Sequence, residues 1–71
     1  MPESVYNVIE IIGSSPDSWD KAAKNAVETA AKSLKDLRVA EVVEMDMQIE
    51  DGKVLSYRTK LRLSFKYHGK V

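Results

Sequence analysis

The sequence contains no cysteine among its 71 residues. Without thiols, the chain can have neither a disulfide framework nor a thiolate metal site. It also lacks an apolar run long enough to cross a bilayer, and it lacks the basic start and apolar core of a signal peptide. We therefore expect a soluble cytoplasmic protein with no membrane partner.

An excess of charge of one sign is absent as well. Lysine plus arginine total 11, as do aspartate plus glutamate, so the formal net charge is zero. Binding to nucleic acid requires a basic surface, which argues against that class of function. A neutral chain repels its own copies little, and a core this small usually needs a metal or an oligomer to support it. We expect a single domain spanning residues 1–71 that associates with itself.

The first half of the chain predicts a strand followed by a helix. The β-branched run "VYNVIEII" predicts a strand from Val5 to Ile12, ended by Gly13. Ser15 is the expected N-cap, with Pro16 at the first helical position. The helix carries an apolar stripe, mostly of alanine, at helical spacing. Its members are Trp19, Ala22, Ala23, Ala26, Val27, Ala30, Leu34 and Leu37.

The second half predicts two long strands joined by a tight turn. The first runs from about Arg38 to Glu50, and Asp51-Gly52 is typical of a two-residue hairpin turn. Simple alternation places the odd-numbered residues of both strands against the helix, with Glu41 as the one charge on that face. The expected fold class is α+β, in β-α-β-β order: a three-stranded antiparallel sheet with one helix packed on one face.

Three stretches of the chain together resemble the dodecin family. They are "VYNVIEIIGSSPDSWDKAAKNAVETAAKSL", "RVAEVVEMDMQI" and "YRTKLRLSFKY", which match in order, length and local residues. The resemblance covers nearly the whole chain. It implies the same β-α-β-β fold and a hollow spherical homododecamer, with helices outside and sheets toward the interior. The charged face of the sheet would then line the inside of the shell.

The resemblance also identifies two positions that matter for a ligand. Many dodecins bind flavins such as riboflavin or FMN through a tryptophan early in the second strand and a glutamine in the third. The matching residues here are Val39 and Arg58. Valine has no aromatic face for stacking, and arginine offers only donors where glutamine also offers an acceptor. This variant is similar to the calcium dodecins, so calcium is favoured over flavin as the bound species.

Glu44 and Asp46 are the candidate metal ligands. They lie two apart in one strand and therefore share the face turned away from the helix. Around a threefold axis of a shell they would form a ring of carboxylates, which suits a hard cation. Alternatively they pair with Arg58, Lys60 or Arg62 on the neighbouring strand, as opposite charges commonly do in sheets.

No nucleophile stands beside an evident base, so we expect no catalysis. The favoured hypothesis is a non-catalytic homododecamer that binds or stores a small ligand, with calcium ahead of flavin. Flavin binding in a modified intersubunit pocket stays open, as does a shell with no dedicated ligand, in which the inner charges form salt bridges.

Overall fold

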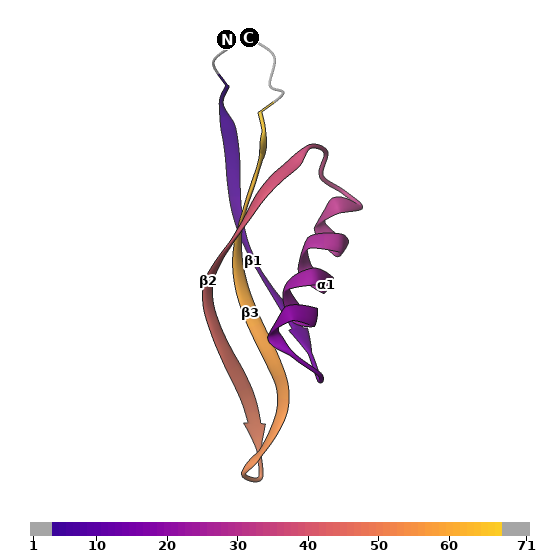
Figure 1. The fold of residues 1–71 in the computed structure, drawn as a ribbon, viewed down its shortest axis with the longest axis vertical. Coiled ribbons are helices and arrows are strands. Elements are labelled where there is room, and N and C mark those ends of the chain that lie inside the picture. Colours follow the sequence, from indigo (N-terminus) through magenta and orange to yellow (C-terminus); the bar gives the residue numbers. More distant parts are fainter. Residues whose placement is uncertain (1–3, 68–71) are drawn as a thin grey trace.

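The computed structural model describes residues 4–67 and contains three strands and one helix. Their bounds, in chain order, are β1 (Tyr6–Ser15), α1 (Trp19–Ala31), β2 (Leu37–Glu50) and β3 (Lys53–Lys66). Both β1 and β2 pair antiparallel with the central β3, giving the order β1-β3-β2. The helix lies against one side of this sheet (Figure 1). The predicted fold class and its one-helix, one-sheet architecture are therefore confirmed.

The hairpin between β2 and β3 is much longer than the helix that covers it. Asp51 and Gly52 connect the strands with φ values of 52° and 74°, as the predicted primed turn requires. A 14-residue strand rises about 46 Å, whereas a 13-residue helix rises only about 20 Å. Figure 1 shows the tip of the hairpin extending well past α1. Much of the helix-side face of the sheet is consequently uncovered.

The core is small for the same reason. Leu61 and Leu63 of β3 are each 1% exposed and contact Ala26 of the helix, and Ala22 is also fully buried. These contacts confirm that the odd-numbered residues in the middle of β3 face α1. Twelve large apolar residues of the described part are exposed. A single chain therefore leaves much apolar surface in water, which is costly.

Gly13 sets how closely the helix approaches β1. A Cβ atom at this position would overlap the carbonyl oxygen of Ala22 and lie 2.8 Å from the Cβ of Ala26. Glycine and alanine thus face each other, and the absence of larger side chains brings the helix backbone against the strand. The alanine-rich stripe predicted from the sequence serves this close packing.

The boundary between β1 and α1 was predicted wrongly. Gly13 does not end the strand, because pairing with β3 continues to Ser15 opposite Tyr57. Ser15 is therefore not the N-cap; its hydroxyl accepts a hydrogen bond from the backbone N–H of Asp17 at 3.1 Å. The cap is Ser18, whose side chain accepts from the N–H of Lys21. Both serines suit a cap, and the extra strand pairing decides between them.

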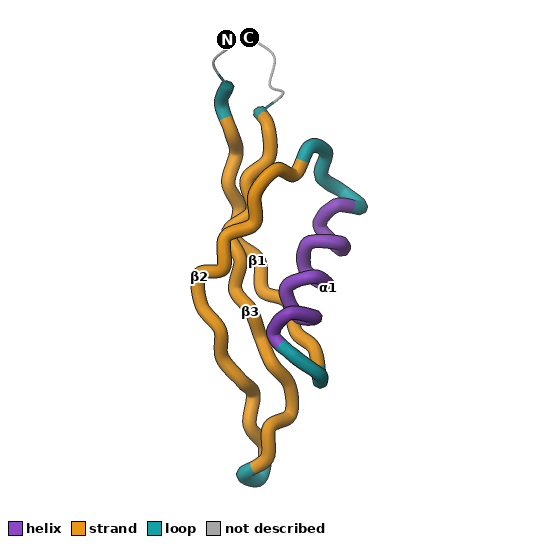
Figure 2. The backbone as a smooth tube through the Cα atoms, in the orientation of Figure 1, coloured by secondary structure: helices purple, strands orange, loops and turns teal. Residues whose placement is uncertain are grey.

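The far end of the helix also differs from the prediction. The helix ends at Ala31, and a short loop leads into β2 (Figure 2). Leu34 lies in that loop and Leu37 begins β2, where it still packs against the core cluster. The last two members of the predicted stripe are therefore outside the helix. No helix in residues 4–67 has the length and apolar character needed to span a membrane.

A β-bulge at Val43 overturns the predicted faces of the first part of β2. The register with β3 shifts between Val42 and Glu44, so simple alternation fails across this point. Before the bulge, Val39 lies opposite Ser64 and therefore shares the face away from the helix. Glu41 moves to that face as well. Ala40 and Val42, expected there, lie opposite Leu63 and Leu61 on the helix side.

Candidate functional site: a charged sheet face

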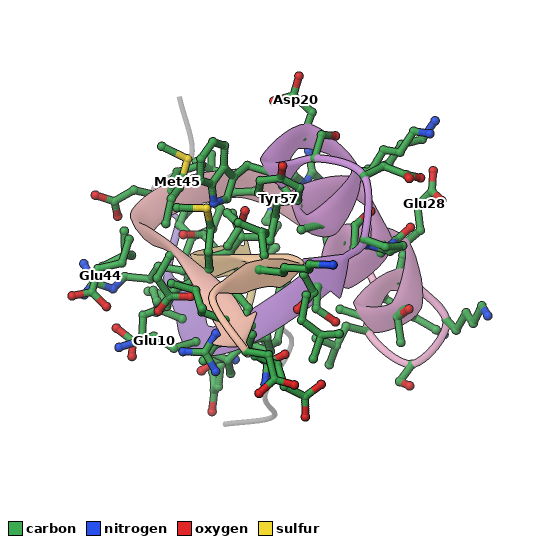
Figure 3. The ribbon with its side chains drawn as sticks, turned by 90° about the horizontal axis from the view of Figure 1, so that it is seen from below. Glu10, Asp20, Glu28, Glu44, Met45 and Tyr57 are labelled. Atoms are coloured by element: carbon green, nitrogen blue, oxygen red, sulfur yellow. The ribbon has the colours of Figure 1, made fainter. Side chains whose placement is uncertain are left out.

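The face of the sheet away from α1 brings together acids from the two edge strands and bases from the central strand. We call this set the charged face. It consists of Glu10 on β1, Glu41, Glu44 and Asp46 on β2, and Arg58, Lys60 and Arg62 on β3. Figure 3 shows Glu10 and Glu44 projecting to the side opposite Met45 and Tyr57. Each of these bases on β3 is thus paired directly with an acid on a neighbouring strand.

Asp46 and Arg58 form the tightest pair on this face. The guanidinium donates from Nε to Oδ1 at 2.7 Å and from a terminal nitrogen to Oδ2 at 2.8 Å. Such a two-point contact fixes both side chains. The hydrogen bond from Arg58 lowers the pKa of Asp46, and the same bond raises the pKa of Arg58. The polar head of Arg58 is therefore engaged within its own chain.

Arg62 lies between two acids. It donates to Glu10 at 2.9 Å and approaches Glu41 on the other edge strand at 3.5 Å. The hydrogen bond from Arg62 lowers the pKa of Glu10. Glu41, expected among apolar residues, instead has a basic partner, because the bulge turns it to the charged face.

Glu44 is the least constrained acid of the candidate metal pair. Its nearest base is Lys60, with Oε1 and Nζ 3.7 Å apart, and its side chain is 68% exposed. The side chain of Asp46 is 50% exposed. The predicted cross-strand pairing is confirmed for both acids. Within residues 4–67 no three histidine, cysteine, aspartate or glutamate side chains form a metal-binding group.

Val39 and Arg58 share the charged side of the sheet but do not meet. Val39 lies opposite Ser64, which is six residues from Arg58 along β3, or about 20 Å. A flavin ring that stacks on Val39 therefore lies too far along the strand to hydrogen-bond to Arg58 of the same chain. Any pocket that uses both positions needs two chains.

Glu10 was not singled out from the sequence, yet it contributes to the charged face. It lies within the apolar strand β1, between Ile9 and Ile11, which face the helix and pack against the core. The sequence did contain one signal: alternation along this apolar strand places Glu10 on the face opposite to its two apolar neighbours. Its partner, Arg62, is 52 residues away in sequence, so the pair becomes evident only once the register is known.

Comparison with known proteins agrees with this fold. The sequence model of the Dodecin family matches residues 5–68. Calcium dodecin of Mycobacterium tuberculosis (strain ATCC 25618 / H37Rv) is 52% identical over 63 residues, which make up 89% of either chain.

Solved structures agree as well. A calcium dodecin structure from M. tuberculosis, described as calcium-chelating with a novel calcium-binding site, has a TM-score of 0.83 at 51% identity and covers 96% of this chain and 97% of that one. The dodecin of Streptomyces coelicolor has a TM-score of 0.92 at 38% identity and covers 99% and 100%. The chain described here belongs to the dodecin family.

Proposed function

We propose that this protein is a non-catalytic homododecamer that binds or stores calcium, in preference to flavin. The observation that carries the proposal is the state of Arg58, which stands where flavin-binding dodecins have glutamine. Nε and one terminal nitrogen of its guanidinium are bound to Asp46, and arginine has no acceptor, so it cannot give a flavin the donor and acceptor that glutamine gives. The marked identity to a calcium dodecin supports the cation.

Assembly is supported by the apolar surface that a single chain leaves uncovered. Val42, Met45 and Met47 on β2 are between 42% and 57% exposed, and β2 is an edge strand. An exposed apolar edge strand associates readily with another chain. Light scattering during size-exclusion chromatography should give about twelve times the chain mass of 8.0 kDa. A monomer or dimer would refute both the shell and any site shared between chains.

Calcium would be held by Glu44 and Asp46 from several chains. The ion takes six to eight oxygen ligands, and Glu44 and Asp46 of one chain offer four carboxylate oxygens at most. Three copies around an axis would supply enough oxygen. Glu44 is the more available ligand, because its contact with Lys60 is long, whereas Asp46 would have to give up Arg58.

Calorimetric titration of the assembled protein with calcium tests this assignment. Glu44→Gln should abolish or strongly weaken binding, because it removes charge and one donor oxygen at every copy. Glu28→Gln is the matched control, since Glu28 lies on α1, away from the charged face (Figure 3). If Glu44→Gln binds calcium as the unaltered protein does, then these residues are not the ligands. If the unaltered protein binds none, the proposed function is wrong.

The preference over flavin has its own test. FMN fluorescence should not be quenched by the unaltered protein at micromolar concentration. The double variant Val39→Trp/Arg58→Gln should quench it, because tryptophan restores the stacking surface and glutamine restores a donor and an acceptor. Strong quenching by the unaltered protein would reverse the order of the two ligands.

A further inference from the structure

The two arginines of the charged face differ in what lies on either side of them. Both are on the central strand, so each has one neighbour on β2 and another on β1. Arg62 lies between two acids, one on each edge strand. Arg58 lies between Asp46 on β2 and Ser14 on β1, so only one of its neighbours carries a charge. The pairing of Arg58 therefore depends on a single carboxylate.

Both oxygens of that carboxylate are bound to the arginine. The guanidinium reaches Oδ1 of Asp46 at 2.7 Å and Oδ2 at 2.8 Å. The contact of Lys60 with Glu44 is looser, because one carboxylate oxygen lies 3.7 Å from the ammonium nitrogen, beyond hydrogen-bond reach. A divalent cation on Asp46 would meet the positive charge of Arg58 beside the carboxylate, unless the arginine moved away.

The strand around Asp46 is held in place independently of Arg58. The backbone carbonyl of Asp46 accepts a hydrogen bond at 3.0 Å from the indole Nε1 of Trp19, the first residue of α1. The pairing with β3 is also continuous over residues 44–48. The side chain of Arg58 is 39% exposed, and directly across from it on β1 the hydroxyl of Ser14 can accept a hydrogen bond. Exchange of the arginine for a cation thus requires one side chain to turn, while the strand stays where it is.

We propose that Arg58 is a built-in competitor for calcium: it occupies Asp46 in the absence of the ion, and calcium must displace it to use that carboxylate. The inference rests on the proposed function, because it concerns the same pair of acids. Arg58 then sets the affinity of the site and excludes monovalent cations, since a single charge gains too little from the carboxylate to replace a two-point guanidinium contact.

Calorimetric titration of the assembled protein with calcium tests the competition. Arg58→Met removes the guanidinium and should lower the Kd for calcium roughly tenfold or more, because several copies of Asp46 are freed at each ion. Arg58→Lys keeps the charge but lacks the planar fork, so the Kd should fall by a smaller factor, about threefold. Damage to the fold cannot tighten a site, and Arg58→Lys decides the question if Arg58→Met does not assemble.

Arg62→Met is the matched control, since it removes the same charge from the same strand and face. Arg62 is bonded to other acids and lies four residues from Arg58, or about 13 Å along β3. Charges that far apart are largely screened at about 0.15 M salt, where the Debye length is about 8 Å. The Kd for calcium should therefore change by less than about twofold in this variant.

A double-variant cycle shows whether Arg58 acts through Asp46. In the Asp46→Asn background, Arg58→Met should give no increase in calcium affinity, because the carboxylate for which the two compete is gone. The competition is overturned if both Arg58 variants bind calcium as the unaltered protein does, or if the increase persists with Asp46→Asn; the proposed function survives either result. Binding by the Arg58 variants alone supports the competition but refutes the proposed function, and binding by none of these proteins refutes both.

Discussion

Replacing Gly13 by alanine should destabilise the protein by forcing α1 away from β1. The new Cβ would overlap the carbonyl oxygen of Ala22, which is helix backbone and cannot rotate away. It would also lie 2.8 Å from the Cβ of Ala26, whereas carbon atoms pack best at about 3.5–4.0 Å. Relief therefore requires the whole helix to shift outward.

The expected cost follows from two opposing effects. Overpacking of a close contact costs about 1–3 kcal/mol. Replacing glycine by alanine also stabilises the folded state by about 0.4–1 kcal/mol, because the unfolded chain then has less conformational entropy to lose on folding. The net destabilisation is about 1–2 kcal/mol, which lowers the melting temperature of a domain of this size by about 4–8 °C per kcal/mol. The melting temperatures should be compared at one protein concentration, because the stability of the proposed oligomer would depend on it.

Two further variants identify the cause. Ala26→Gly in the Gly13→Ala background should recover little stability, since the overlap with the backbone of Ala22 persists. Gly52→Asn should cost less than Gly13→Ala, because Gly52 has nothing within 4 Å of a Cβ and its φ of 74° strains asparagine less than most residues. If Gly13→Ala melts within about 2 °C of the unaltered protein, the close approach does not limit the packing.

Other expected outcomes concern the two faces of the sheet. Asp46 and Glu10 have lowered folded pKa values, so their stabilising effect is full above the ordinary values of 3.8 and 4.5 and disappears as the pH falls through the folded values. Acid unfolding followed by circular dichroism should show this loss of stability. In Asp46→Asn the stability should fall less between neutral and acid pH. Arg62→Met should lower the melting temperature at low salt but much less at 1 M salt, because salt screens the exposed Arg62 pairs of the unaltered protein, which the variant lacks. Thr59→Val removes the buried bond to the carbonyl of Trp19 and should cost about 1 kcal/mol in denaturant unfolding; no change would mean that this bond does not hold the helix start.

The elements of the fold could be predicted from the sequence because each has a strong local signal. The β-branched run, the alanine stripe and Asp51-Gly52 indicated strand, helix and turn before any contact was known. The boundary at Ser15 could not be predicted, since Ser15 and Ser18 are equally good caps. Only the pairing of Ser15 with Tyr57, 42 positions later, extends β1 through it.

The faces of β2 illustrate a second limit of sequence reasoning. The rule of alternation holds only while the register is continuous, and nothing local in "AEVVEM" identifies Val43 as a bulge. Glu41 among apolar residues was the one visible conflict. Such a conflict indicates a register shift as readily as it indicates a functional charge, and here the shift explains it.

The distribution of charge over the strands bears on which ligand the charged face suits. Its bases, Arg58, Lys60 and Arg62, all lie on the central strand, and each lies within 4.0 Å of an acid of the same chain. Its acids all lie on the edge strands β1 and β2, so the outer side of each acid can meet another copy of the chain. In the proposed assembly, a ligand that entered between copies would meet carboxylates before it met a free guanidinium or ammonium group. Carboxylates at the outer edges favour a cation over the phosphate of FMN. This preference comes from the placement of the acids on the edge strands and not from the net charge, which is zero.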